Sequence, residues 1–263
     1  MSKRIRLLVR ADDAGSSWSS NMGCLNASTH GVAKSVEVMM PCAWTSHAAT
    51  VFGHRTDVDI GIHLTLTSEW DAVKWRPITA ANSLTDEFGN FYALLYPRAG
   101  DQRPSLSETD WLLDEIASEL RAQVALGLKM FPHASHVSSH MLKHFRDFDD
   151  SLGDVISDIC EEFNVSDDAF GYGLTRIDGY PNFPRNAERR VEAFIQQLGE
   201  LQPGTYVFID HPAVASPELA AMGHVGYEDV GEDRLACMDT LTSPVLREQI
   251  DQIGVELISY RDL

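Results

Sequence analysis

Short apolar runs alternate along this chain with amphipathic stretches, and this alternation is the feature that most limits its fold. Strands separated by helices are typical of α/β proteins whose strands run mostly parallel. The predicted strands are residues 5–11, 35–41, 59–66, 134–138, 171–177, 205–210 and 254–259. Because we find no internal repeat and no clear linker, we expect a single domain over residues 1–263.

Amphipathic spacing predicts helices between these strands. In residues 107–128, apolar side chains recur at roughly helical intervals, and the polar start Ser-Glu-Thr-Asp favours an N-cap there. The other predicted helices are residues 21–31, 187–198 and 243–253. Two stretches, 80–105 and 212–234, lack periodicity. Long irregular segments in a compact domain are usually functional or disordered, and the aromatic residues of 80–105 favour a loop packed near a site.

The net negative charge of the chain disfavours partners that are themselves negatively charged. Its 263 residues include 39 Asp and Glu against 21 Lys and Arg, so the net charge is −18 at pH 7. Nucleic acid and anionic membranes require a basic surface, so we expect neither as a partner. No run of about 18 apolar residues predicts a transmembrane helix, and the first apolar run is too short for a signal peptide.

These features are typical of a cytoplasmic protein. The four cysteines are scattered and form no CxxC pair, so we expect buried free thiols in place of disulfides. Soluble enzymes of this size are often dimers, which makes a homodimer the default expectation.

Polar residues lie at the ends of several predicted strands. Asp12 and Asp13 follow the first strand, His63 lies within the third, His140 follows the fourth, and His211 follows residues 205–210. In parallel α/β folds, ligands bind at the carboxyl ends of the strands, so these side chains should gather at one edge. Carboxylates and imidazoles that meet in one place predict a metal site.

The adjacent carboxylates of Asp12 and Asp13 need an explanation, because like charges repel unless a positive charge lies near. A metal ion, a salt bridge to Lys or Arg, and simple turn chemistry before Gly15 are the three candidate explanations. Adjacent strand residues point to opposite faces, so we expect one aspartate to bind the metal while the other faces a different space.

His136 and His140 flank Val137, Ser138 and Ser139, a sequence that favours a strand or loop over a helix. In a strand the two histidines would lie ~13 Å apart on one face, so both cannot reach one ion. One of the pair is therefore expected to ligate, and His140, nearer the carboxyl end, is the better candidate. A histidine taken alone is more often structural than ligating.

Several short motifs follow one another along the chain. They are RADDAG at 10–15, GIHLTL at 61–66, SLTDEFGNF at 83–91, SHVSSHML at 135–142, HPA at 211–213, LTSPVLR at 241–247 and ISYRDL at 258–263. In order and content they resemble the NADDFG, GxHLTL, SLTDxxGxF, THxDSHxH, HPA and C-terminal motifs of the YdjC/ChbG-like carbohydrate deacetylases. This likeness runs nearly end to end, which makes it more specific than any single motif.

The resemblance implies a distorted (β/α) barrel-like fold and one divalent metal ion, Zn²⁺ or Mg²⁺, held by Asp13, His63 and His140. It implies that Asp12 is the general base and His211 the general acid in removing the acetyl group from an N-acetylated amino sugar or oligosaccharide. The expected partner is thus a small N-acetylated sugar. Mixed His and Asp ligation suits zinc, whereas an open, hydrated site also accommodates magnesium, manganese or cobalt.

The chain departs from the family motifs at four positions. Arg10 and Ala14 replace the Asn and Phe of NADDFG, and Ser138 and Leu142 replace the Asp and the last His of THxDSHxH. These changes spare the implied ligands and acid–base residues, so they bear on the substrate more than on the chemistry. Ser138 would lie on the strand face between His136 and His140, a place suited to supporting a metal ligand.

Candidate substrate contacts are weaker inferences. Arg176 lies near the end of the predicted strand 171–177, where it would bind a substrate oxygen or form a surface salt bridge, and His136 is the second candidate. His224 and Arg234 are placed near the same edge by position alone. Two alternatives to a deacetylase stay open: a metal-dependent hydrolase of another ester or amide on the same fold, and a non-catalytic sugar- or metal-binding protein.

Overall fold

The computed structural model describes residues 4–168, 172–180 and 185–263. Its strands form one sheet in the order β5-β4-β3-β2-β1-β7-β6, with β8 paired beside the first half of β1. Every pairing is parallel. The strands are β1 (Ile5–Ala14), β2 (Ser35–Val38), β3 (Asp59–Leu64), β4 (His136–Ser139), β5 (Ser166–Asp167), β6 (Thr175–Arg176), β7 (Gly204–Asp210) and β8 (Glu256–Ile258).

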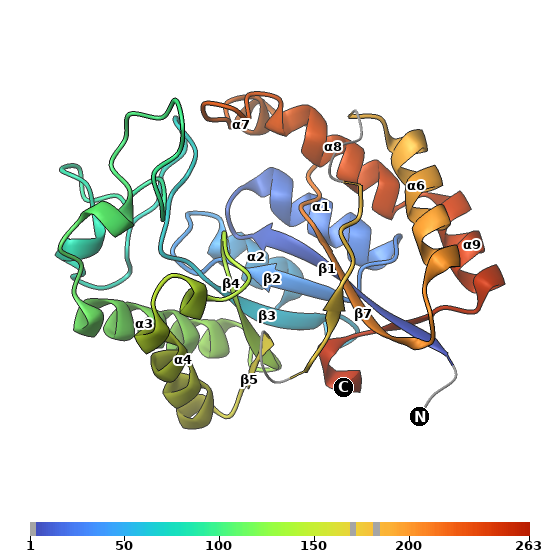
Figure 1. Cartoon of the computed structure of the whole chain (residues 1–263), viewed down its shortest axis with the longest axis horizontal. Coiled ribbons are helices and arrows are strands. Elements are labelled where there is room, and N and C mark those ends of the chain that lie inside the picture. Colours follow the sequence, from blue (N-terminus) through green and yellow to red (C-terminus); the bar gives the residue numbers. More distant parts are fainter. Residues whose placement is uncertain (1–3, 169–171, 181–184) are drawn as a thin grey trace.

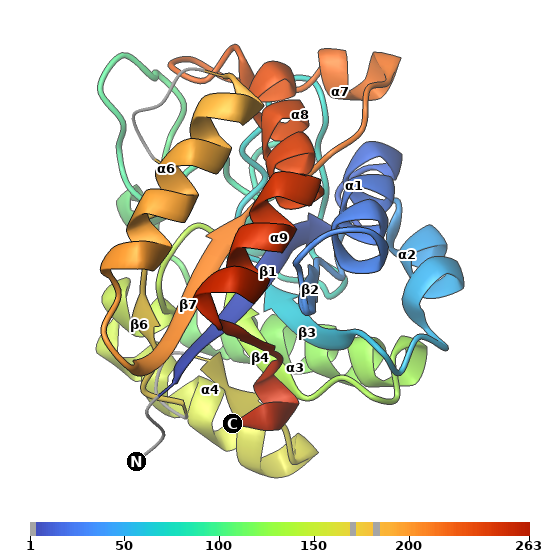
Figure 2. The ribbon, with the colours of Figure 1, turned by 90° about the vertical axis from the view of Figure 1, so that its right-hand side faces the viewer.

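The sheet curls into an open half barrel with helices around it (Figure 1). Its edges are β5 and β6, and no pairing between the described residues joins them. The helices are α1 (Trp18–Thr29), α2 (Thr45–Phe52), α3 (Leu113–Met130), α4 (Asp150–Phe163), α6 (Ala187–Glu200), α7 (Pro217–Ala220), α8 (Val230–Leu241) and α9 (Pro244–Ile253). Figure 2 shows α6, α8 and α9 grouped beside β7 and β1, with α1 and α2 next to them. The predicted parallel, barrel-like α/β fold is confirmed.

Strand β1 lies at the centre of the sheet, and its alternating side chains serve two different environments. Leu7 and Val9 are fully buried in the main core, whereas Leu8 packs in a separate small cluster with Tyr260. A strand buried on both faces has a continuous apolar run, as residues 7–9 of β1 do. Successive residues on the face of Leu8 become polar toward the carboxyl end, so the same face carries Asp12 into the site described below.

Several local predictions are wrong. The helix predicted over 107–128 begins at Leu113, because Ser105 and Glu108 form a capping box around a short 3₁₀ turn instead. In the strand predicted over 171–177, only Thr175–Arg176 is extended, and Gly171 lies outside the described residues. The elements β5, α2 and α4 were not predicted, and α8 begins within the stretch 212–234 that was expected to be irregular.

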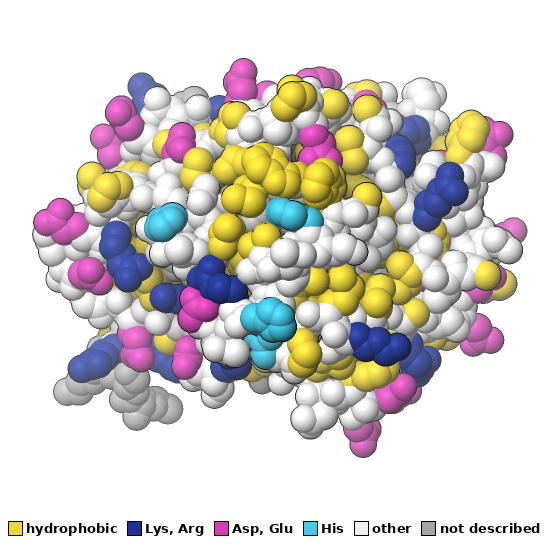
Figure 3. Space-filling view, turned by 180° about the vertical axis from the view of Figure 1, so that it is seen from behind, with side chains coloured by type: hydrophobic (Ala, Val, Ile, Leu, Met, Phe, Trp, Pro, Cys, Tyr) yellow, Lys and Arg dark blue, Asp and Glu magenta, His cyan; other side chains and the backbone are white. Residues whose placement is uncertain are grey.

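The four cysteines are free and three of them are buried, as expected. Within the described part of the chain, no helix combines the length and the apolar character needed to cross a bilayer. Figure 3 shows the face opposite that of Figure 1, where acidic and basic side chains are interspersed around a group of hydrophobic ones.

Gly15 permits the turn that follows β1, so its replacement should destabilise the protein. Its φ is +92°, and a Cβ there would lie 2.7 Å from the backbone oxygen of Met39. We expect Gly15→Ala to lower the free energy of unfolding by about 1–3 kcal/mol, since both the backbone and the new methyl group would be strained. Chemical denaturation measures this change.

Gly199→Ala is the matched control, because Gly199 lies in α6 with no atom within 4 Å of the added Cβ. Replacing a helical glycine by alanine should raise the free energy of unfolding by about 0.4–1 kcal/mol. Equal effects of the two substitutions would contradict the role given to Gly15.

Candidate active site

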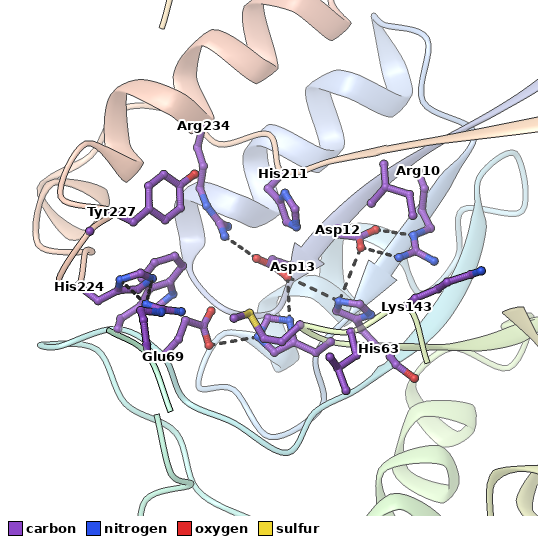
Figure 4. Close-up of a pocket in the computed structure, with 18 of the residues that line it drawn as sticks. Arg10, Asp12, Asp13, His63, Glu69, Lys143, His211, His224, Tyr227 and Arg234 are labelled. Atoms are coloured by element: carbon purple, nitrogen blue, oxygen red, sulfur yellow. Dashed lines mark hydrogen bonds and ion pairs between the residues drawn. The ribbon is translucent and has the colours of Figure 1, made fainter. Parts of the chain in front are cut away.

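A cavity of about 650 Å³ opens at the carboxyl ends of β1, β3, β4 and β7. The predicted residues Asp12, Asp13, His63, His140 and His211 all line it (Figure 4). They lie in or directly after four different strands, β1, β3, β4 and β7, so the parallel sheet is what gathers them at one edge. The cavity is also lined by Arg10, Glu69, Trp70, Arg98, Ala99, Ser139, Met141, Leu142, Lys143, Arg176, Ile209, His224, Val225, Gly226, Tyr227 and Arg234.

An irregularity at the end of β1 turns both aspartates toward this cavity. The pairing with β2 passes from Ala11 opposite Val36 to Ala14 opposite Val38, so β1 contains one extra residue over this span. Asp13 has a φ of 69°, in the left-handed region that few non-glycine residues adopt. Because this bulge interrupts the alternation of side chains, the prediction that the two aspartates face different spaces is wrong.

Asp13, His63 and His140 form a compact cluster whose potential ligand atoms all lie within 4.8 Å of one another. Asp13 Oδ1 lies 3.7 Å from His63 Nε2 and 3.4 Å from His140 Nδ1. This oxygen is buried and makes no hydrogen bond within the described structure. A buried carboxylate oxygen with no donor, facing two imidazole nitrogens, matches the donor set of a divalent metal ion.

In each imidazole, the nitrogen that does not face Asp13 has a hydrogen-bonding partner of its own. His63 Nδ1 lies 2.8 Å from Ser138 Oγ, and His140 Nε2 lies 3.1 Å from Glu69 Oε2. Such partners orient a histidine toward a metal and set which nitrogen carries the proton. Burial lowers the pKa of His63 well below its usual value, and the neighbouring His140 lowers it further.

His140 differs from His63 in its charge. Burial alone would lower the pKa of His140, but Glu69 and Asp13 outweigh burial and raise its pKa to about 10. His140 is therefore an imidazolium in the metal-free protein at neutral pH, and it must lose a proton to act as a ligand.

Each aspartate is paired with an arginine, so the salt-bridge explanation of the Asp-Asp pair also holds. Arg10 donates from Nε and Nη2 to the two oxygens of Asp12, at 2.7 Å each, and Arg234 donates to Asp13 Oδ2 at 2.5 Å. Burial raises the pKa of Asp12, which Arg10 opposes. Burial would also raise the pKa of Asp13, but Arg234 and His211 bring its pKa well below the usual value.

His211 lies at the mouth of the site, with 41% of its side chain exposed. Its Nδ1 lies 3.6 Å from Asp210 Oδ1, while Asp210 accepts hydrogen bonds from the His211 backbone N–H and from the Tyr180 hydroxyl. Burial would lower the pKa of His211, but Asp13 and Asp210 raise it above the usual value. A raised pKa favours the protonated form of the imidazole, which is the form that can donate a proton.

Of the candidate substrate contacts, three line the cavity and one does not. Arg176, His224 and Arg234 line the cavity, as their positions indicated. His136 does not, because it is fully buried between Glu37 and the ring of Tyr260. The prediction that His136 contacts substrate is therefore corrected: it is placed to support buried structure and not to touch a ligand.

Two glutamates of the site were missed. Glu37 lies inside the apolar run VEVMM, and a charge within a buried strand is itself a signal, because such a group needs a buried partner. Glu69 follows β3 in an irregular segment, where no local pattern distinguishes it from a surface residue. The loop at 80–105 does reach the site, through Arg98 and Ala99.

Comparison with known proteins agrees with this geometry. Residues 6–252 match the family model described as YdjC-like protein. This chain belongs to the YdjC-like family. A chitooligosaccharide deacetylase from Yersinia enterocolitica is 29% identical over 97% of this chain and 98% of its own length. A carbohydrate deacetylase from Thermus thermophilus is 30% identical over 70% of each chain.

A solved structure shares the fold of this YdjC-like protein. It is described as a putative cellobiose-phosphate cleavage protein from Enterococcus faecalis V583. Its TM-score is 0.75, with 99% of both chains covered and 20% sequence identity. The likeness therefore extends over the whole curled sheet and its helices.

Proposed function

We propose that this YdjC-like protein is a metal-dependent carbohydrate N-deacetylase, which hydrolyses the acetamide of an N-acetylated amino sugar or oligosaccharide. The observation that carries the proposal is the unsatisfied Oδ1 of Asp13 facing His63 and His140. Asp12 and His211 beside this cluster supply a carboxylate and an imidazole whose pKa is raised above its usual value. The names of the Yersinia and Thermus relatives support the same reaction.

Amide hydrolysis requires a stronger nucleophile, a polarised carbonyl and a protonated leaving group. A divalent ion held by Asp13, His63 and His140 supplies Lewis acidity toward water and the acetyl carbonyl. Asp12 accepts a proton as water adds to the carbonyl carbon, and its burial raises its pKa toward that task. His211 donates a proton to the sugar nitrogen as the C–N bond breaks, and acetate and a free amine leave.

The remaining cavity wall offers hydrogen-bond donors to the sugar. Lys143, Arg176 and Arg98 line the cavity, and Arg98 belongs to the loop at 80–105. Arg98 Nη1 contacts His224 at 2.8 Å, and the His224 ring stacks on Trp70 with 5.6 Å between ring centroids. These contacts tie the loop residue Arg98 to the aromatic side chains that line the cavity.

Acetate release tests the proposed function. We expect the protein to release acetate from N-acetylglucosamine oligomers and to lose this activity when a chelator removes the metal. Release that persists in chelator would contradict the metal mechanism. Sugar binding without release would indicate a binding protein, and hydrolysis confined to other esters or amides would indicate a different hydrolase.

The substitution Asp12→Asn tests the general base without removing a proposed metal ligand. Because asparagine keeps the shape of the side chain but accepts a proton poorly, we expect kcat to fall by ~10²–10⁴-fold. Metal content should stay unchanged, since Asp12 is not in the ligand cluster. Full activity in this variant, with metal bound, would rule out Asp12 as the base.

His140→Ala tests the ligand cluster directly. Losing one of three protein ligands should weaken metal binding by more than the ~10–100-fold that loss of a supporting partner costs. Elemental analysis of the purified variant measures the bound metal. His54→Ala, which removes an exposed histidine outside the cavity, is the matched control and should retain the metal. Equal metal content in the two variants would eliminate His140 as a ligand.

A further inference from the structure

A chain of buried hydrogen bonds runs behind His63, on the side away from the ligand cluster. Ser138 Oγ lies 2.8 Å from His63 Nδ1 and donates to Glu37 Oε2 at 2.5 Å. The three side chains come from adjacent strands β3, β4 and β2, and none is more than 2% exposed. The contacts behind His63 are therefore shielded from bulk solvent.

The direction of these hydrogen bonds is set by proton count. A serine hydroxyl has one proton, and a carboxylate only accepts. Because the Ser138 proton goes to Glu37, Ser138 Oγ has only lone pairs to offer His63. His63 Nδ1 must then carry the proton and donate it, which leaves the lone pair on Nε2, the nitrogen that faces Asp13.

Glu37 is itself held in this position from its other side. Its Oε1 receives His136 Nε2 at 2.9 Å and Ser35 Oγ at 3.0 Å. Burial would raise the pKa of Glu37, but His136 and Arg10 bring its pKa well below the usual value, so it is ionised. Gly61 makes room for the carboxylate, since a Cβ there would lie 2.0 Å from Glu37 Oε2.

We propose that Glu37 is a positioning residue for the metal site, acting through Ser138 to fix His63 in the tautomer whose Nε2 is free to ligate. The proposal rests on the proposed function for the identity of the site as a metal site. Ser138 stands where the related motif carries Asp, so in this chain β2 supplies the carboxylate that β4 lacks. His136, absent from the cavity, takes part by holding Glu37.

Glu37→Gln is the informative substitution because it reverses one hydrogen bond. Ser35 and His136 both donate to the Oε1 position, so the glutamine oxygen takes that place and its NH₂ group turns to Ser138. Ser138 then accepts from glutamine and donates its proton to His63 Nδ1. Because the buried Ser138 proton has His63 Nδ1 as its acceptor, the opposite tautomer of His63 is favoured, with the proton on Nε2, where it opposes metal binding.

Two measurements test this. Titration of Zn²⁺ against a competing chelator should show ~10–100-fold weaker binding in Glu37→Gln than in the unmodified protein. Nitrogen-15 NMR of the metal-free proteins should show His63 protonated at Nδ1 in the unmodified protein and at Nε2 in the variant. The same tautomer in both proteins, or unchanged zinc affinity, would overturn the proposal.

Controls separate this role from a general loss of stability. Glu119→Gln changes another fully buried glutamate, which accepts hydrogen bonds from Thr79 and Gln123, and it should leave zinc affinity unchanged. Ser138→Ala keeps Glu37 but breaks its connection to His63, so it should also weaken zinc binding. If Glu37→Gln fails to fold, Ser138→Ala decides, and unchanged zinc affinity in that variant would refute the proposal.

The outcome is distinguishable from failure of the proposed function. A protein that binds Zn²⁺ in a Glu37-dependent way but releases no acetate would retain the role of Glu37 and refute the deacetylase. A protein that binds none of Zn²⁺, Mg²⁺, Mn²⁺ and Co²⁺ would refute both, whatever the tautomer of His63.

Discussion

The structure of the site depends on one constraint: negatively charged side chains are buried near the carboxyl ends of the strands. Asp12, Asp13 and Glu37 are each at most 2% exposed, and an unpaired carboxylate at such a depth is very unfavourable. Each has a nitrogen donor of its own: Arg10 for Asp12, Arg234 for Asp13, and His136 for Glu37. Among the oxygens of these three carboxylates, Asp13 Oδ1 alone has no hydrogen-bond donor, and it faces the imidazoles.

This pairing also explains how an acidic chain buries two adjacent aspartates without a large electrostatic penalty. The chain has a net charge of −18, yet five of its 21 lysines and arginines line one cavity. Two of them, Arg10 and Arg234, neutralise Asp12 and Asp13 before any ion arrives. Arg234 occupies Oδ2 of Asp13 and leaves Oδ1 available, so it limits that aspartate to one free ligand atom.

Strand-end residues were predictable from the sequence because parallel strands bring their carboxyl ends together, whatever the loops do. That rule is enough to gather Asp13, His63 and His140, and strand spacing separates His136 from His140. It fails where alternation is interrupted, as at the bulge of β1, since nothing in RADDAG shows which aspartate takes the left-handed conformation. Glu69 was missed because its role depends on a fold-back of an irregular segment, a long-range contact with no local signature.

Glu37 shows that a carboxylate missing from one motif position can be supplied by a residue on a neighbouring strand. Seen along the sequence, Ser138 is the loss of a carboxylate beside two histidines. In the sheet, Glu37 on β2 pairs with Gly61 on β3, and Gly61 pairs with His136 on β4. Gly61 on β3 leaves a space between β2 and β4. The Glu37 side chain crosses this space to reach Ser138. Hydrogen-bonding chemistry at the back of His63 is thus a property of three neighbouring strands, so a carboxylate on any of them with access to that space can supply it.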